Sequence, residues 1–374
     1  MKIAYFVHDL TDPAVERRVR MLNAGGADVV VLGFRRAQAG PATINGAPVV
    51  DLGRTYDGRL GHRALASLFA AMGARRLRAV LADAEVILAR SLEMLVVAQA
   101  ARTLCALRAG LIYECLDIHR AMLGESLASR LLRALERGLM WRCRLLVVSS
   151  PAFLDAYFRP RQGLGGALPL PALLVENKLL ELESPPDRAA SSRPRGRPWR
   201  IAWLGAIRCR KSLDVLTSLA ARRPDLVEVS IHGRPAYCEF ADFDAQVTAA
   251  PNLSFGGSYA ASDLPDLYGA ADFSWAIDFM EEGKNSAWLL PNRLYESSRF
   301  GVAPIALSSV ETGRFLDAKG FGVTLADISA LEALLDGMTR ERYADLRARQ
   351  ARVALSAFVA DRADCRALVA ALAA

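Results

Sequence analysis

The chain has 374 residues, of which 52% are hydrophobic and 23% are charged, and its formal net charge is +7. This composition is typical of globular proteins, and the length suits two domains better than one core. No run approaches the ~20 apolar residues of a membrane span, and the spacing of the cysteines and histidines does not resemble a zinc site.

The chain begins with an apolar strand at residues 2–7, which is too short for a signal peptide, so we expect a cytoplasmic protein. Asp12 followed by Pro13 predicts a helix start, and residues 25–26 predict its end. A second strand follows at residues 29–32, and this β-α-β unit favours a parallel sheet. Further strands are predicted at residues 49–52, 86–89, 111–113, 145–149 and 173–176.

Polar side chains follow two of these strands. His8 and Asp9 come after the first strand, and Asp117 and His119 come after the strand at 111–113. Both loops are expected at the carboxyl edge of the sheet, where ligands bind in doubly wound folds. Asp117 or His119 is a candidate general base. The alternatives are a His-capped loop with ion-paired carboxylates and, for Asp9, a side chain that only shapes its loop.

Two basic segments lie in the first half, which carries 24 Lys/Arg against 16 Asp/Glu up to residue 182; the remainder carries 23 against 24. Cationic helices with an apolar stripe suit an anionic membrane surface. The alternative is a core-facing stripe with solvated arginines. No recognised motif predicts nucleic-acid binding. The arginines in question are Arg59, Arg63, Arg75, Arg76, Arg78, Arg130, Arg133, Arg137, Arg142 and Arg144.

Residues 183–198 are rich in Pro, Ser and Arg and have no periodicity, so they predict a linker between an α/β domain at 1–182 and a second at 199–374. The last predicted helix, 361–373, is free to cross back to the first domain. Two Rossmann-like, doubly wound parallel-sheet domains facing across a cleft are therefore expected. Strands of the second domain are predicted at residues 200–205, 227–232, 253–255, 272–277 and 302–307.

The first strand of the second domain leads into a basic loop. Arg208, Arg210 and Lys211 precede a helix for which Ser212 is the expected N-cap. Cations on a strand-to-helix loop favour a phosphate ligand. An ordinary basic surface loop is the alternative.

A second phosphate-type loop precedes the strand at 302–307. Pro291 stands at a helix start, Arg293 lies in the first turn, and Glu296 follows one turn later. Free N–H groups, the helix dipole and a guanidinium together favour a diphosphate, while the carboxylate can accept hydrogen bonds from sugar or ribose hydroxyls. The pattern indicates a nucleotide-sugar site and not a nicotinamide site.

Two further polar motifs are weaker indicators of a binding site. In the loop at 281–286, Lys284 or Asn285 could bind sugar hydroxyls or phosphate, and a solvated turn is the alternative. Asp242 and Asp244 form a D-x-D string, but it falls in a helix predicted between residues 237 and 249, so we do not expect it to bind metal.

At these residues, and over nearly its whole length, the chain resembles the GT-B glycosyltransferases, most closely the glycosyltransferase family 4-like enzymes of bacterial exopolysaccharide assembly. The strings that carry the resemblance are residues 147–157, 175–178, 201–215, 231–233, 255–256 and 267–272.

The resemblance implies transfer of a sugar from a nucleoside-diphosphate sugar, such as a UDP-sugar, to a hydroxyl of a saccharide acceptor, without a cofactor or a metal ion. The acceptor is often polyprenyl-diphosphate-linked at the inner face of the cell membrane, where the N-terminal domain would meet the anionic surface as a peripheral protein. Donor-binding positions are Gly205, Arg208, Lys211, His232, Gly233, Asn285, Asn292, Arg293, Leu294 and Glu296; acceptor-binding positions are His8 and Asp9; catalytic positions are Asp117 and His119.

The chain also departs from the family pattern. Ala206 replaces an arginine, Ser212 replaces a glycine, and Trp288 replaces the first glutamate of an E-x7-E pair, which assigns its sugar contact to Asn285 or Glu282. A non-hydrolysing nucleotide-sugar epimerase of the same architecture and a non-catalytic binding module are the alternatives. A nicotinamide oxidoreductase is disfavoured because the first β-α turn has no G-x-G-x-x-G.

Overall fold

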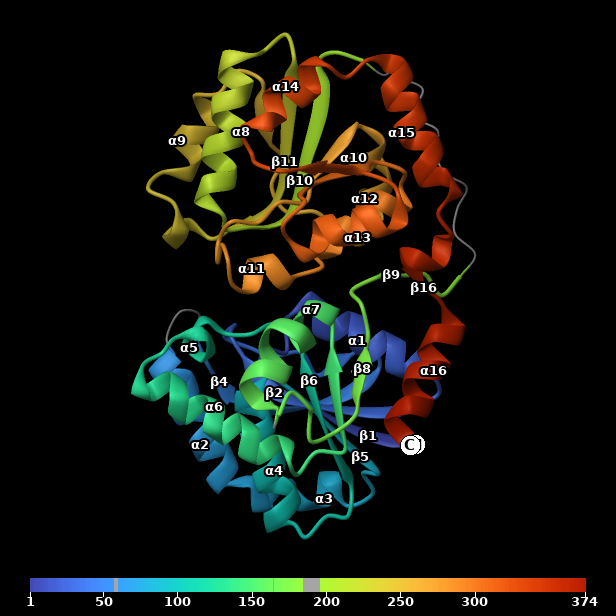
Figure 1. The fold of residues 1–374 in the computed structure, drawn as a ribbon. Helices are drawn as coiled ribbons and strands as arrows, with labels where there is room; N and C mark the ends of the chain where they lie inside the picture. The colour runs from blue at the N-terminus through green and yellow to red at the C-terminus, as the bar shows by residue number, and fades with distance from the viewer. Residues whose placement is uncertain (57–59, 164, 184–195) are drawn as a thin grey trace. The chain divides into compact units, whose positions relative to one another are not determined.

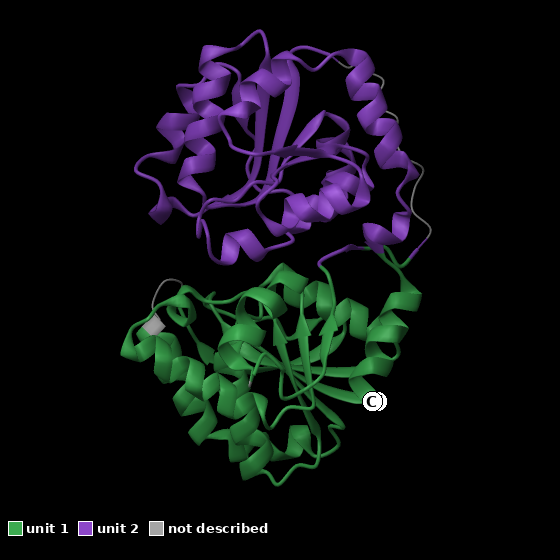
Figure 2. Cartoon of the chain, viewed as in Figure 1, with its two compact units in different colours: residues 1–176, 180–182, 360–374 green, residues 177–179, 183–359 purple. Residues whose placement is uncertain are grey.

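The computed structural model divides into two compact units, which Figure 2 shows in different colours. Unit 1 comprises residues 1–176, 180–182 and 360–374, and unit 2 comprises residues 177–179 and 183–359. Most of the linker predicted at 183–198, and Arg59, lie outside the described residues. The structure describes residues 1–56, 60–163, 165–183 and 196–374.

Unit 1 contains an eight-stranded sheet in the order β3-β4-β2-β1-β5-β6-β7-β8 (Figure 1). Neighbouring strands are parallel except β3 and β4. The strand order reverses between β1 and β5, so the two loops that leave these strands diverge and frame a crevice. The strands are β1 (Lys2–Val7), β2 (Asp28–Arg35), β3 (Thr43–Ile44), β4 (Ala47–Arg54), β5 (Val86–Arg90), β6 (Gly110–Cys115), β7 (Leu145–Val148) and β8 (Ala172–Leu174).

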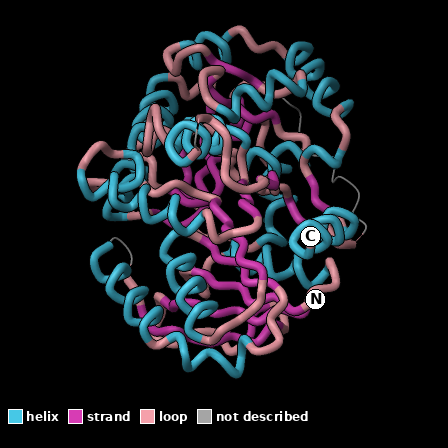
Figure 3. The backbone as a smooth tube through the Cα atoms, turned by 60° about the horizontal axis from the view of Figure 1, so that its bottom comes forward, coloured by secondary structure: helices cyan, strands magenta, loops and turns pink. Residues whose placement is uncertain are grey.

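The helices of unit 1 cover the sheet, and Figure 3 shows strands enclosed by helices. The predicted cap of the first helix is confirmed, because the Asp12 side chain accepts a hydrogen bond from the Ala14 amide at 2.9 Å. The helices are α1 (Pro13–Ala24), α2 (Leu60–Met72), η1 (Ala74–Leu77), α3 (Arg78–Leu81), α4 (Leu92–Leu104), α5 (Arg120–Leu123), α6 (Leu127–Met140), α7 (Pro151–Phe153), η2 (Leu154–Gln162) and α16 (Arg362–Ala373).

The last helix of the chain, α16, packs on α1 within unit 1. Gly25 makes this packing close, since a Cβ atom there would lie 2.3 Å from the carbonyl oxygen of Cys365. Arg144 secures the end of α16 by donating to the carbonyl of Leu372. Within the described part of the chain, no helix has both the length and the apolar character that crossing a bilayer requires.

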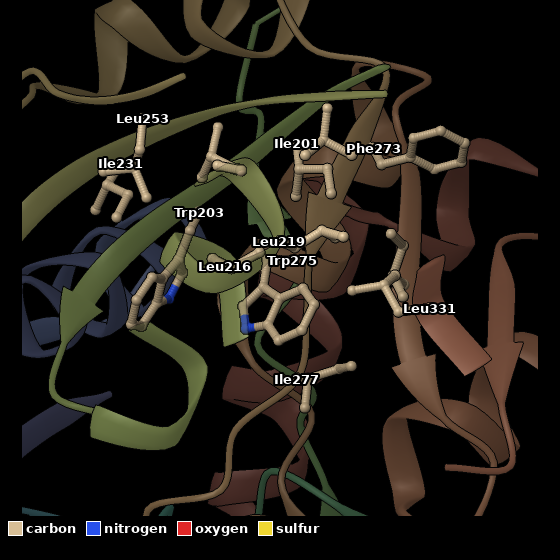
Figure 4. Packing of buried hydrophobic residues seen from close by; sticks show 14 of the residues in the cluster. Ile201, Trp203, Leu216, Leu219, Ile231, Leu253, Phe273, Trp275, Ile277 and Leu331 are labelled. Carbon is tan, nitrogen blue, oxygen red and sulfur yellow. The ribbon is translucent and has the colours of Figure 1, made fainter. Parts of the chain in front are cut away.

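Unit 2 is built on a six-stranded, fully parallel sheet in the order β12-β11-β10-β13-β14-β15. Trp203 and Trp275 from neighbouring strands are buried in its core against Leu216 of α8 (Figure 4). The strands are β10 (Trp199–Ile207), β11 (Val227–Pro235), β12 (Leu253–Phe255), β13 (Phe273–Trp275), β14 (Ala303–Leu307) and β15 (Val323–Leu325). A further two-stranded sheet joins β9 (Leu179–Leu180) and β16 (Val359–Ala360).

The strand order in unit 2 reverses between β10 and β13, which again marks the position of a ligand crevice. The helices of this unit are α8 (Arg210–Arg222), η3 (Tyr237–Glu239), α9 (Phe243–Thr248), η4 (Ala261–Asp263), α10 (Leu264–Gly269), α11 (Asn285–Trp288), α12 (Asn292–Arg299), α13 (Glu311–Lys319), α14 (Ala330–Asp336), α15 (Arg340–Arg352) and η5 (Leu355–Ala357).

Two local predictions for unit 2 were wrong. Ser212 is not the N-cap of α8: the helix begins three residues earlier than predicted, at Arg210, and the cap is Cys209, whose sulfur accepts from the Ser212 amide at 3.4 Å. The single helix predicted at 237–249 is broken into η3 and α9, because the Asp242 side chain accepts from the Ala245 amide at 2.9 Å and starts a new helix.

Candidate functional site

Two cationic side chains of unit 2 follow the carboxyl end of β10 and contact the loop that follows β13. Lys211 Nζ lies 2.8 Å from a carboxylate oxygen of Glu282 and 4.3 Å from the centre of the Phe279 ring. Arg208 Nη2 lies 3.7 Å from Asp278 Oδ2. The strand-order reversal at β10 and β13 therefore places two cations and two carboxylates at one edge of the sheet.

Arg293 reaches the same loop from the first turn of α12. Its Nη2 donates to the carbonyl of Ile277 at 3.2 Å, and its buried Nε has no hydrogen-bond partner among the described residues. Burial lowers the pKa of Arg293, although Asp278 opposes the shift, and an arginine stays cationic in either case. Arg208, Lys211 and Arg293 thus converge on residues 277–282.

Glu296 lies one turn further along α12 and faces tyrosines. The Tyr268 hydroxyl donates to Glu296 Oε2 at 3.2 Å. Burial raises the pKa of Tyr259, and the charge of Glu296 adds to the shift, which places this second phenol near the carboxylate. Asn285, at the start of α11, is only 4% exposed. Asn292 and Leu294 lie beside Arg293 in the first turn of α12.

Two glycines allow backbone to pack against backbone between β10 and β11. Gly205 and Gly233 are register partners, and a Cβ atom on Gly233 would lie 1.7 Å from the Gly205 carbonyl oxygen. His232 precedes this contact and packs over Gly256, where a Cβ atom would lie 2.2 Å from its ring. Burial lowers the pKa of His232, so its ring is held neutral.

In unit 1, the loop after β1 is tied down from several sides. Asp9 is 5% exposed and accepts hydrogen bonds from the Thr11 amide and hydroxyl at 2.9 and 2.8 Å. Arg36 Nε lies 3.1 Å from its other oxygen. These contacts favour the loop-shaping alternative for Asp9. His8 remains beside Asp12, with 3.9 Å between Nε2 and Oδ2, and burial together with Arg90 lowers the pKa of His8.

A buried ion-pair network surrounds Glu114 of β6, and its member Arg90 also acts on His8. Glu114 accepts from the Tyr5 hydroxyl and from Arg18 Nε, each at 2.6 Å, and lies 3.7 Å from Arg90 Nε. Burial would raise the pKa of Glu114, but Arg18 and Arg90 outweigh burial and lower it. This ion-paired carboxylate is therefore structural.

His119 lies just after β6 and caps α5. Its Nδ1 accepts a hydrogen bond from the Ala121 amide at 3.1 Å, so in the neutral ring Nε2 carries the proton. Burial and the nearby Arg63 lower the pKa of His119, which keeps the ring neutral near pH 7. Asp117 lies close enough to contribute to the same electrostatic environment.

One ion pair near both histidines was missed by sequence reasoning. Arg63 of α2 pairs with Glu93 at the start of α4, and both charges act on His8 as well as on His119. Glu93 follows β5 at the sheet edge where the other site residues follow β1 and β6, and this position is a signal that could have identified it.

Among the described residues, no group of three or more His, Cys, Asp or Glu side chains is arranged to hold a metal ion. The site residues of unit 2 instead form one cationic cluster with Glu296 one turn away. Those of unit 1 form a mixed cluster of His8, Asp117 and His119 around the Arg63–Glu93 pair.

Comparisons with known proteins agree with this arrangement. No protein-family model matches the chain. The chain is 45% identical over 376 residues to the succinoglycan biosynthesis protein ExoL of Rhizobium meliloti (strain 1021). The match covers 99% of this chain and 92% of that protein.

Solved structures share the fold at low sequence identity. Sucrose-phosphate synthase from Thermosynechococcus elongatus has a TM-score of 0.73 at 13% identity, over 100% of this chain and 98% of that one. Anabaena Alr3699/HepE in complex with UDP-glucose has a TM-score of 0.69 at 16% identity, over 99% and 98%. The resemblance found in the sequence is confirmed: the chain belongs to the family of the succinoglycan biosynthesis protein ExoL and has the GT-B fold.

Proposed function

We propose that this protein is a glycosyltransferase that takes a sugar from a UDP-sugar and transfers it to a hydroxyl of a polyprenyl-diphosphate-linked saccharide during exopolysaccharide synthesis. The observation that carries the donor assignment is the convergence of Arg208, Lys211 and Arg293 on one loop at the strand-order reversal of unit 2. Anabaena HepE, which shares the fold, is known in complex with UDP-glucose, and this supports the choice of nucleotide.

The cations would stabilise the charge that develops on the leaving group. In the transfer, the bond between the anomeric carbon and the diphosphate oxygen breaks, and a bond from the acceptor oxygen to that carbon forms. Two guanidinium groups and one ammonium group would neutralise the departing UDP electrostatically, as preorganised donors do at developing oxyanions. We therefore expect transfer without a divalent metal ion. Glu296, and Asn285 or Glu282, would bind hydroxyls of the ribose or sugar.

We assign the acceptor hydroxyl to unit 1. His119 uses Nδ1 as a helix cap, so its Nε2–H is a hydrogen-bond donor, and the role of general base falls to Asp117. The proton of the acceptor hydroxyl would pass to the Asp117 carboxylate. His8 would contact the saccharide, while Asp9 holds the loop.

Unit 1 would also meet an anionic membrane surface, because it exposes large apolar side chains next to arginines. Leu65, Phe69 and Met72 of α2 and Leu131 of α6 are exposed, which contradicts the core-facing alternative. Four of the ten arginines of the basic segments are removed from the membrane-facing set, because Arg63 pairs with Glu93 and three others donate to backbone carbonyls. Arg133, Arg137 and Arg144 donate to the carbonyls of Met122, Arg161 and Leu372, respectively.

The test uses the purified chain with a panel of nucleotide sugars and a lipid extract as the acceptor source. We expect UDP-sugars to raise the melting temperature without magnesium, and UDP release to require the extract. If no nucleotide sugar stabilises the protein and no UDP is released, the proposal is wrong. A new sugar nucleotide formed from the donor alone would instead identify an epimerase.

A further inference from the structure

A cavity of about 430 Å³ opens in unit 1 and is lined by α2, α4 and α6 together with residues of β6 and of the segment that follows it. Figure 1 labels the three helices. α2 and α6 both pack on α4. The volume lies within the roughly 300–1,000 Å³ of small-molecule pockets, and a mostly hydrophobic lining is typical of such sites. The transfer step proposed above uses only the part of this cavity near Asp117 and His119.

The cavity is polar at one end. α2, α4 and α6 all run from the carboxyl edge of the parallel sheet toward its amino edge. The polar lining residues Arg63 and Glu93 lie near the starts of α2 and α4, and Asp117 and His119 follow the carboxyl end of β6. This end therefore coincides with the candidate acceptor site.

The other end is apolar and continuous with the outer surface. The lining residues further along the helices are Leu68, Val96, Leu132 and Leu135. Leu68 and Leu135 line the cavity while being 51% and 45% exposed. They adjoin Phe69 on α2 and Leu131 on α6, so apolar surface extends from inside the cavity to the outer face of both helices.

One acidic side chain, Glu136, lies in the apolar part of this lining, but it is fully engaged. Glu136 is 2% exposed and accepts hydrogen bonds from the Tyr113 and Tyr157 hydroxyls at 2.8 and 2.6 Å and from Gln162. Burial raises the pKa of Glu136, and no cation pairs with it among the described residues. A buried polar group whose hydrogen bonds are made is compatible with an apolar ligand beside it.

The ligand that fits has an anionic head and an apolar chain. At the polar end, the Arg63 guanidinium, which also pairs with Glu93, and the His119 Nε2–H can donate to phosphate oxygens. We propose that the cavity binds the isoprenoid units of the acceptor that adjoin its diphosphate, with the diphosphate near Arg63 and the chain passing between α2 and α6. This inference rests on the proposed function, in which the acceptor is polyprenyl-linked.

Binding of farnesyl diphosphate to the full chain, measured by calorimetry without donor, tests the proposal. Val96→Trp fills the cavity from α4, and Ala64→Trp fills it from an exposed lining position that folding tolerates more readily. Val80→Trp is the matched control, because Val80 is exposed on α3 and does not line the cavity. We expect at least tenfold weaker binding in either filled variant and unchanged binding in the control.

Three results would overturn the inference: equal affinity in filled and unfilled proteins, binding of inorganic diphosphate as tight as that of farnesyl diphosphate, or equally tight binding of dodecyl phosphate. The last would assign the cavity to any alkyl chain. The readout is independent of sugar transfer. Sugar transfer without binding of farnesyl diphosphate would refute only this inference. Binding of farnesyl diphosphate without sugar transfer would refute only the proposed function.

Discussion

The imidazole of His119 accepts a hydrogen bond at Nδ1 from the backbone N–H of Ala121, at 3.1 Å. This bond leaves Nε2 protonated, so the ring can donate a hydrogen bond but cannot remove the proton of an acceptor hydroxyl. Asp117→Asn should therefore lower kcat by about 10²–10⁴-fold, the usual contribution of a general base. His119→Gln should keep most activity, because a glutamine offers both an acceptor for the cap and an N–H donor. Acceptor-dependent UDP release measures both variants, and equal inactivation of the two would refute the assignment.

The same histidine provides a control through the pH dependence of stability. Burial and Arg63 lower the pKa of His119 in the folded state below the value of about 6.5 in the unfolded chain. Its contribution to stability is thus complete above pH 6.5 and is lost as the pH falls through the folded-state pKa. Between pH 7.5 and 5, His119→Gln should lose less melting temperature than the wild type. An identical pH dependence would show that the ring titrates normally.

Substitutions of Lys211 and of Glu282, which form an ion pair, are expected to change the KM for the donor in opposite directions. Both side chains are about half exposed, so the pair is worth about 0.2–1 kcal/mol. If a diphosphate displaces Glu282 from the ammonium group, Glu282→Gln should lower the KM for the donor by up to about fivefold. Lys211→Met should raise it, and Lys319→Met, an exposed lysine of α13, should not change it. A higher KM in Glu282→Gln would instead mean that Glu282 binds the sugar.

Substitution of Arg293 tests whether this side chain stabilises the negative charge of the departing UDP. Arg293→Ala should lower kcat by about 10²–10³-fold, the usual effect of removing one oxyanion-stabilising donor. The melting temperature should change little, since the substitution removes a buried cation whose Nε has no hydrogen-bond partner among the described residues. Arg314→Ala, on the exposed face of α13, is the control for loss of positive charge. Activity within twofold of the wild type in Arg293→Ala would contradict the donor site.

Much of this site could be predicted from the sequence, because parallel strands buried on both faces are apolar runs and their carboxyl ends are the first polar positions after them. Arg208 and Lys211 were found in this way, and Arg293 was found from the helix start at Pro291. The start of α8 was not, because a cysteine is an uncommon cap; its sulfur accepts from the amide of Ser212, the residue that was expected to cap the helix.

Contacts between residues distant in sequence could not be predicted. The Arg63–Glu93 pair joins two helices across 30 positions, and no local pattern indicates which arginine of a basic segment it involves. For the same reason, Arg133 and Arg137 were counted as surface charges although their guanidinium groups bind backbone carbonyls. A count of charges cannot separate a solvated arginine from one that satisfies buried acceptors.

Membrane binding should depend on apolar side chains and on charge. Phe69→Ser should weaken sedimentation with phosphatidylglycerol vesicles, because a Phe side chain is worth about 1.5–3 kcal/mol when buried. Arg76→Gln should weaken it by about fivefold, the equivalent of ~1 kcal/mol per basic residue. Leu355→Ser, an exposed leucine of unit 2, is the control. Equal binding to phosphatidylcholine vesicles, or no loss in Phe69→Ser, would argue against this surface.

Gly233 should be among the positions of unit 2 that tolerate a side chain least. Its φ of +143° is a conformation that L side chains rarely adopt, and a Cβ atom would lie 1.7 Å from the Gly205 carbonyl oxygen. Backbone strain and overpacking together predict that Gly233→Ala lowers the free energy of unfolding by about 2–5 kcal/mol. Gly320→Ala isolates the strain, because Gly320 has a φ of +71° and open space around it, and should cost roughly 1–2 kcal/mol. Urea unfolding measures both, and equal losses would mean that β10 and β11 move apart easily at Gly233.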